Sequence, residues 1–133
     1  MIIHHVGYAV KNLKEARKRF KELGFEEEAR IFEDNLRKVM IQFMRNGKYR
    51  IELIAPMDGN SSPIDDILKK TGPTPYHICY EVEDLESSIR EFRKKGYLLL
   101  HPPAEAVALD RRKVAFLYNL HIGIVEFVDK KSK

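Results

Sequence analysis

One stretch of this chain occurs twice, and the repeat limits the folds the chain can adopt. Residues 5–25 and 77–97 align without a gap at a constant offset of 72 residues (77 − 5). Six positions are identical, pairing His5 with His77, Tyr8 with Tyr80, Val10 with Val82, Leu13 with Leu85, Phe20 with Phe92 and Gly24 with Gly96. Later, Arg37-Lys38-Val39 recurs as Arg112-Lys113-Val114, and Ile51-Glu52-Leu53 as Val125-Glu126-Phe127. A repeat of this kind predicts two copies of one supersecondary unit.

Hydrophobic periodicity predicts the same order of elements in both copies. Asn12 and Asp84 are the expected helix N-caps. The first copy is expected to contain a strand at 3–10, a helix at 13–23, and strands at 25–33, 37–45 and 48–55. The second is expected to contain a strand at 76–82, a helix at 85–95, and strands at 97–101, 112–118 and 122–128. The predicted fold class is therefore α+β, with two tandem βαβββ modules.

The breaker-rich segment 56–62 and a short helix that starts at Ser62 are expected to join the two copies. We therefore predict one domain over residues 1–133, with module one at about 1–56, a linker helix at about 57–74 and module two at about 75–129. We expect the two long helices to lie on the convex face. In each module, side chains from the first strand should be buried with side chains from the helix. The two expected sets are Tyr8, Val10, Leu13 and Phe20, and Tyr80, Val82, Leu85 and Phe92.

Composition excludes several classes of protein. The net charge is +4, but basic and acidic residues are interleaved, so a nucleic-acid partner is not expected. No apolar run is long enough for a membrane span, and Met1-Ile2-Ile3-His4-His5 does not resemble a signal peptide. The single cysteine, Cys79, cannot form an internal disulfide, which is consistent with a reducing cytosol. We expect a cytoplasmic enzyme or binding protein.

The repeat gives each copy a histidine in its first strand and a glutamate in its last. A glutamate among apolar strand neighbours must face solvent, pair with a charge or bind a metal, and solvent exposure is the commonest outcome for a single such residue. Two modules related by a pseudo-two-fold axis would bring equivalent residues together. The set His5, Glu52, His77 and Glu126 would then offer two nitrogen and two oxygen ligands. His4 lies on the other face of its strand, so it is left out.

These motifs resemble the vicinal oxygen chelate superfamily, which includes glyoxalase I and methylmalonyl-CoA epimerase. The resemblance covers nearly the whole chain. It rests on His-Val-Gly-Tyr-Ala-Val (5–10), Ile-Glu-Leu-Ile-Ala-Pro (51–56), Ser-Pro-Ile-Asp (62–65), His-Ile-Cys-Tyr-Glu-Val-Glu-Asp (77–84), Lys-Val-Ala-Phe-Leu (113–117) and Val-Glu-Phe (125–127). In that superfamily, paired βαβββ modules form a half-open barrel around a divalent metal.

The resemblance implies that His5, Glu52, His77 and Glu126 are metal ligands. The expected metal is nickel, cobalt, zinc, manganese or iron. The implied chemistry removes and returns a proton α to a carbonyl through a metal-bound enediolate, with Glu126 as the base and Glu52 as the alternate. The expected substrate is a small anionic thiol derivative or thioester, with glutathione or another thiol as a co-substrate in the first case. A homodimer could complete the cavity.

Two differences from the epimerase pattern decide which substrate the sequence favours. The epimerase pattern can carry an extra glutamate on the strand at 38–44, where this chain has none. Its His-Pro-Lys and paired glycines are also replaced, here by Tyr118-Asn119-Leu120-His121. Sequence analysis therefore favours a glyoxalase I-type (lactoylglutathione lyase-like) reaction on the hemithioacetal of methylglyoxal. Methylmalonyl-CoA epimerase is the alternative.

A non-catalytic binding protein of the same superfamily is a further alternative. The four retained ligand positions argue against it, because the drug-sequestering members lack them. A ring-cleaving dioxygenase is disfavoured because its iron takes two histidines and one carboxylate.

Two further hypotheses concern the surroundings of the site. The segment 102–111 has no hydrophobic period and is expected to be a mobile loop or lid. Arg37, Arg50 and Arg112 lie near site strands and are proposed anchors for a substrate carboxylate or phosphate.

Overall fold

The computed structural model describes residues 1–58 and 61–130, and it divides the chain into two compact units. One unit comprises His5–Tyr76 and is named module one here. The other comprises Met1–His4 together with His77–Lys133 and is named module two. The predicted α+β class is confirmed. Each module contains one strand, a helix and four further strands, and the first two of these four are only two or three residues long. That the two modules act as one domain stays a prediction.

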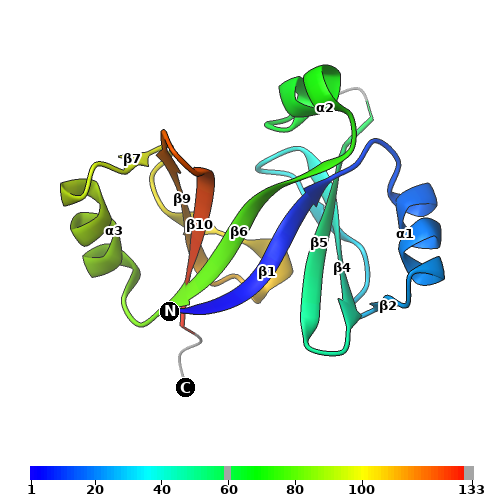
Figure 1. Ribbon diagram of the computed structural model, residues 1–133, viewed down its shortest axis with the longest axis horizontal. Helices are drawn as coiled ribbons and strands as arrows, with labels where there is room; N and C mark the ends of the chain where they lie inside the picture. The colour runs from blue at the N-terminus through cyan, green and yellow to red at the C-terminus, as the bar shows by residue number, and fades with distance from the viewer. Residues whose placement is uncertain (59–60, 131–133) are drawn as a thin grey trace. The chain divides into compact units, whose positions relative to one another are not determined.

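Module one is an open sheet with a helix against one face (Figure 1). Its strands follow the order β2-β4-β5-β1, with β3 also paired to β4. Neighbours in this order are antiparallel except β1 and β5, which are parallel. The elements are β1 (Ile2–Ala9), α1 (Leu13–Glu22), β2 (Glu26–Glu27), β3 (Phe32–Asp34), β4 (Val39–Asn46), β5 (Tyr49–Pro56) and α2 (Asp65–Thr71).

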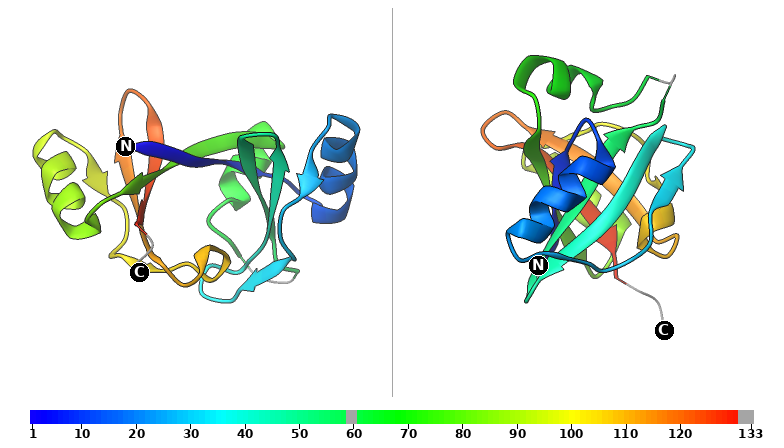
Figure 2. Two further views of the ribbon diagram at one scale, coloured as in Figure 1. Left: turned by 90° about the horizontal axis from the view of Figure 1, so that it is seen from below. Right: turned by 90° about the vertical axis from the view of Figure 1, so that its right-hand side faces the viewer.

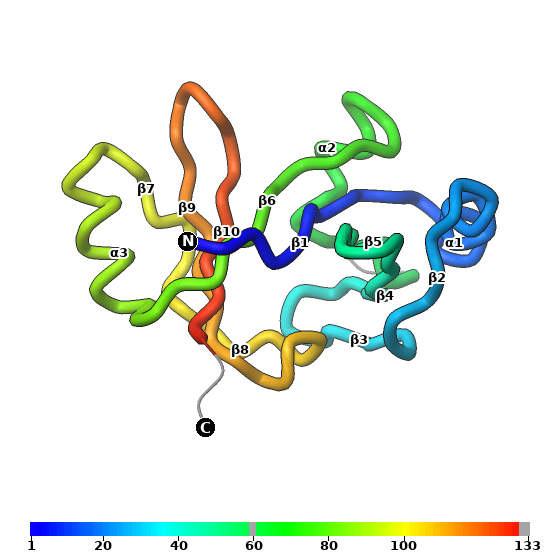
Figure 3. The backbone as a smooth tube through the Cα atoms, turned by 60° about the horizontal axis from the view of Figure 1, so that its bottom comes forward, coloured from blue at the N-terminus to red at the C-terminus, as the bar shows by residue number. Residues whose placement is uncertain are grey.

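Module two repeats this topology in the order β7-β9-β10-β6, with β8 also paired to β9. Here β10 and β6 are the parallel pair. Figure 3 shows β7, β9 and β10 running side by side. The elements are β6 (Thr74–Val82), α3 (Leu85–Lys94), β7 (Leu98–Leu99), β8 (Ala104–Glu105), the 3-10 turn η1 (Val107–Leu109), β9 (Lys113–Asn119) and β10 (Gly123–Asp129).

Local sequence signals start and end the two long helices. Asn12 Oδ1 accepts a hydrogen bond from the Glu15 backbone N–H at 2.9 Å, and Asp84 Oδ1 accepts one from the Ser87 N–H at 3.4 Å. Both caps were expected. Gly24 then follows α1 with a φ of +94°, a left-handed conformation that a side chain would strain. The repeated helix boundaries therefore come from repeated local residues.

Each helix packs on one face of its sheet, and the expectation that this face is convex stays a prediction. In module one, Tyr8, Leu13 and Phe20 pack against a buried cluster that contains Val10. Figure 2 shows α1 lying across β4 and β5. In module two the buried cluster contains Val82 and Leu85, joined by the half-buried Tyr80 and Phe92. Its other buried members are Ile89, Ala115, Leu117, Val125 and Phe127. The helix face of each sheet thus carries an apolar cluster, and the predicted site residues lie on the opposite faces.

Two segments differ from the sequence-based expectations. The strand predicted over 25–33 is interrupted, because only its two ends pair with β4. The segment 102–111, predicted as a loop, contains β8 and η1. Ala106 and Leu109 are buried there, and β8 pairs with β9. A short strand pairing and two buried side chains therefore anchor part of this segment. Its expected mobility and lid role stay predictions.

Among the described residues, no helix is long and apolar enough to cross a membrane.

Candidate metal centre

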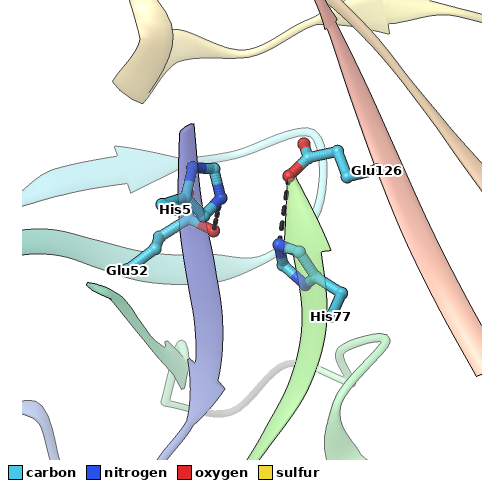
Figure 4. Close-up of side chains that lie close together, drawn as sticks. All are labelled: His5, Glu52, His77 and Glu126. Carbon is cyan, nitrogen blue, oxygen red and sulfur yellow. Dashed lines mark ion pairs between the residues drawn. The ribbon is translucent and has the colours of Figure 1, made fainter. Parts of the chain in front are cut away.

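Module one contains a buried histidine–glutamate pair. His5 lies on β1 and Glu52 on the parallel strand β5, and their exposed fractions are 1% and 5%. Because Gly7 is the register partner of Glu52, the two side chains meet diagonally across adjacent strands. His5 Nε2 lies 3.3 Å from Glu52 Oε1 (Figure 4). The small Gly7 between them leaves the carboxylate room to reach the imidazole.

Module two contains the equivalent pair. His77 on β6 and Glu126 on β10 are buried to a similar degree, at 4% and 3% exposure. The register partner of Glu126 is Cys79, which has taken the place of Gly7. His77 Nε2 lies 3.0 Å from Glu126 Oε1 (Figure 4). The sequence repeat is therefore also a repeat of geometry, since both pairs use the same strands, diagonal and imidazole nitrogen.

A phenylalanine packs against each histidine, and sequence reasoning missed both. Phe43 is the register partner of Glu52, and its ring meets the His5 ring edge-on at 5.1 Å between centroids. Phe116 is the register partner of Glu126 and meets the His77 ring at 5.4 Å. Edge-on aromatic packing restricts rotation of the imidazole. The equivalence was hidden because the repeated Arg-Lys-Val motif before these strands has an offset of 75 residues (112 − 37), whereas the two phenylalanines are 73 residues apart (116 − 43).

His4 does not take part in either pair. Successive side chains on a strand point to opposite faces, so His4 faces away from His5. Its Nε2 lies 3.5 Å from Arg112 Nη2. Its omission from the expected ligands agrees with this placement.

Comparison with known proteins identifies the family. Residues 4–116 match the family model described as the glyoxalase/bleomycin resistance protein/dioxygenase superfamily. The chain belongs to this superfamily. It is 30% identical over 118 residues to an ethylmalonyl-CoA/methylmalonyl-CoA epimerase of Cereibacter sphaeroides, covering 87% of each chain. The resemblance seen in the sequence is thereby confirmed.

Solved structures of the superfamily share the fold. Methylmalonyl-CoA epimerase from Mycobacterium tuberculosis superposes with a TM-score of 0.85 at 24% identity, over 98% of this chain and 88% of that one. A Streptomyces coelicolor methylmalonyl-CoA epimerase in complex with 2-nitronate-propionyl-CoA also gives 0.85, at 20% identity and 99% coverage of both chains. At these identities the likeness establishes the fold alone.

Each of the three arginines proposed as substrate anchors has a carboxylate partner in its own module. Arg37 pairs with Asp34 at 2.8 Å, and Arg50 pairs with Glu28 at 2.7 Å. Arg112 lies 2.8 Å from Glu81 Oε2, and its Nε donates to the Leu109 carbonyl. Arg112 therefore fastens η1 to β6. The anchor hypothesis stays a prediction for all three.

Glu28 joins two arginines beside the module one pair. Arg50 and Arg45 both bond its carboxylate, with Arg45 Nη1 at 2.8 Å from Oε2. The hydrogen bond from Arg50 is the largest cause that holds the pKa of Glu28 below its usual 4.5; partial burial opposes it, and the Arg45 bond adds to the lowering. The Glu28 carboxylate is thus held in ion pairs with Arg45 and Arg50.

Proposed function

We propose that this chain is a metal-dependent epimerase of α-alkylmalonyl-CoA thioesters. The observation that carries the proposal is the repeated, buried His–Glu–Phe arrangement at equivalent strand positions of two βαβββ modules. Sequence analysis favoured a glyoxalase I-type reaction. The Cereibacter relative named for ethylmalonyl-CoA and methylmalonyl-CoA supports the alternative instead, and we adopt that alternative. Its 30% identity extends over 87% of both chains rather than over isolated motifs.

The residues present fit a divalent metal. Each pair holds an imidazole nitrogen and a carboxylate oxygen beside each other in a buried position. Neutral imidazole with carboxylate suits zinc, nickel, cobalt and manganese. A catalytic metal usually has at least three protein ligands, and one pair supplies only two. We therefore propose that His5, Glu52, His77 and Glu126 together bind one ion. When bound, the ion supplies positive charge that stabilises negative charge developing on the thioester oxygen.

In this proposal, the two glutamates carry out the proton transfers. Epimerisation inverts the α-carbon, so one group must remove a proton from one side and another must supply a proton to the other side. We assign removal to Glu126 and return to Glu52 for one direction of the reaction; the roles exchange for the reverse direction. One carboxylate from each module matches this requirement. Phe43 and Phe116 pack against the two imidazoles and restrict their rotation.

The β4 strand offers no third carboxylate to this chemistry. Its residues on the Glu52 side of the sheet are Val39, Ile41, Phe43 and Arg45, as the register with β5 shows. Gln42 lies on the helix side, where it accepts a hydrogen bond from Arg17 at 3.0 Å. The extra glutamate of the epimerase pattern therefore has no counterpart on this strand. The two ligand glutamates must serve as the bases.

The decisive experiment compares two substrates on one metal-loaded preparation. Methylmalonyl-CoA in D₂O should exchange its α-proton for deuterium and convert from one α-carbon epimer into a mixture of both, while the methylglyoxal–glutathione hemithioacetal should be turned over far more slowly. Removing the metal with a chelator should abolish the exchange, and adding it back should restore it. Faster turnover of the hemithioacetal would favour the glyoxalase reaction. Tight binding of metal and thioester without exchange would identify a binding protein, and full activity without metal would refute the mechanism.

A further inference from the structure

The two modules differ in the chemical character of four equivalent positions on the sheet faces that carry the His–Glu pairs. In module one these positions hold two glutamates and two arginines. They are Glu26 and Glu28 after α1, Arg45 on β4, and Arg50 on β5. Arg45 and Arg50 are register partners, and Glu26 pairs with Arg45. All four lie on the face that carries Glu52, because the intervening Ile51 and Met44 pack in the helix-side core.

In module two the same positions are apolar. We name them the apolar strip: Leu98, Leu100, Tyr118 and Ile124. Leu98 and Ile124 are both register partners of Tyr118, as Glu26 and Arg50 are of Arg45. The Leu100 N–H donates to the Phe116 carbonyl, as the Glu28 N–H donates to that of Phe43. The equivalence therefore extends to individual backbone hydrogen bonds.

The apolar strip lies on the Glu126 face of its sheet and remains open to solvent. The alternate residues Leu99, Leu117 and Val125 pack in the helix-side core, so the strip points the other way. Leu98 is 62% exposed, and Leu100 and Tyr118 are each 38% exposed. Neighbouring apolar side chains that are exposed to solvent on one sheet face are costly unless something covers them. The strip starts at Ile124, which is two residues, or about 7 Å, before Glu126 on β10.

We infer that the apolar strip binds the α-alkyl group of the thioester and sets a preference for alkyl groups longer than methyl. The inference rests on the proposed function, since it places the α-carbon at Glu126. A methyl group would end near the carboxylate, whereas an ethyl to butyl chain would extend onto Ile124 and Tyr118. The strip matches a hydrocarbon better than the pantetheine arm, because its only side-chain polar group is the Tyr118 hydroxyl, which leaves the pantetheine amides few partners.

The test uses binding of a thioester series, a readout that needs no turnover. Straight-chain acyl-CoA compounds from propionyl- to hexanoyl-CoA are titrated into the metal-loaded protein by calorimetry, with free CoA as the reference. Affinity should rise roughly threefold to fourfold per added methylene, the factor expected for burying one such group. Leu98→Glu, which restores the module one residue type, should abolish the rise and leave propionyl-CoA affinity unchanged. Leu36→Glu adds the same charge at a 69% exposed position of module one and should behave as the unmodified protein.

The outcomes separate this inference from the proposed function. Equal affinity along the series in the unmodified protein would overturn the inference. So would a Leu98→Glu variant that weakens all thioesters and free CoA alike, because that result would assign the strip to the pantetheine arm. A chain-length dependence that Leu98→Glu removes, in a protein that does not exchange the α-proton of methylmalonyl-CoA, would refute the epimerase and leave the strip as an acyl-binding subsite.

Discussion

The two modules share one His–Glu geometry, but its surroundings are polar and charged in module one and apolar in module two. The helix–sheet interface of module one contains a polar network. There, Arg17 Nη1 donates to the buried Gln42 at 3.0 Å, and Gln42 donates in turn to the Ala29 carbonyl. The position equivalent to Arg17 in module two is Ile89, which is 5% exposed and packs with Ala115 and Phe127.

The same contrast holds beside the His–Glu pairs, where module one carries arginines and glutamates and module two carries the apolar strip. The histidine, glutamate and phenylalanine are nevertheless kept in both modules. The two modules therefore repeat the His–Glu–Phe arrangement, while the helix packing and the surface around it differ between them. Module two is therefore the half suited to an apolar part of a substrate, and module one is the half with fixed charge.

The largest expected effect is on the rate of α-proton exchange, and it should differ between variants of the two glutamates. Glu126→Gln should lower the rate of α-proton exchange by roughly 10²- to 10⁴-fold, because an amide cannot accept the proton. Exchange of methylmalonyl-CoA in D₂O, followed by NMR, measures it, and metal content should stay close to that of the unmodified protein. Glu52→Gln is the matched control and should slow exchange less when the substrate is the epimer whose proton Glu126 removes. An unchanged rate in Glu126→Gln would remove this residue as the base.

The two histidines should contribute equally to metal binding, whereas the two glutamates should contribute unequally to proton exchange. His5→Ala and His77→Ala each remove one proposed ligand from one module. Each should weaken metal binding by more than the roughly 10- to 100-fold that loss of an outer-shell partner costs. Metal retained after dialysis against a weak chelator measures this effect. If one variant kept its metal, the two pairs would not bind one ion together.

The helix interfaces should differ in their response to truncation. Ile89→Ala should lower the free energy of unfolding by about 2–5 kcal/mol, since it opens a cavity in an apolar core. Arg17→Ala in module one should cost only about 1–3 kcal/mol, the range for leaving a buried polar partner unsatisfied. Urea denaturation of the two variants gives both values. Equal losses would mean that the polar network of module one packs as tightly as the core of module two.

The smallest expected effect is a change in how the stability of the fold depends on pH. Because the folded-state pKa of Glu28 is lowered from 4.5, its ion pairs contribute stability that is complete above that pH and is lost as pH falls through the folded pKa. Glu28→Gln should therefore lower stability by about 1 kcal/mol at neutral pH and leave it unchanged at the acid end. Melting temperatures from pH 7 to pH 3 test this. A constant difference across that range would show that Glu28 acts through packing and not through its charge.

Much of the fold could be predicted because it depends on local signals. Asn12 and Asp84 cap their helices, Gly24 follows the first of them, and strand alternation separates the His5 face from the His4 face. The exact repeat places His77 beside Glu126 as soon as His5 is placed beside Glu52. These predictions need only the periods of helix and strand and the equality of the two copies.

Tertiary structure alone decided which side chains meet across strands. Phe43 and Phe116 reach the histidines through the register of β4 and β9, and Glu28 reaches Arg45 and Arg50 from a segment more than fifteen residues earlier. Alternation predicts the face of a strand on which a residue lies, but it does not predict the residue opposite. Register is fixed by hairpin geometry and by burial of one whole face, and both depend on contacts distant in sequence. The sequence by itself therefore determined the repeated His–Glu pairs, and the folded sheet determined what surrounds them.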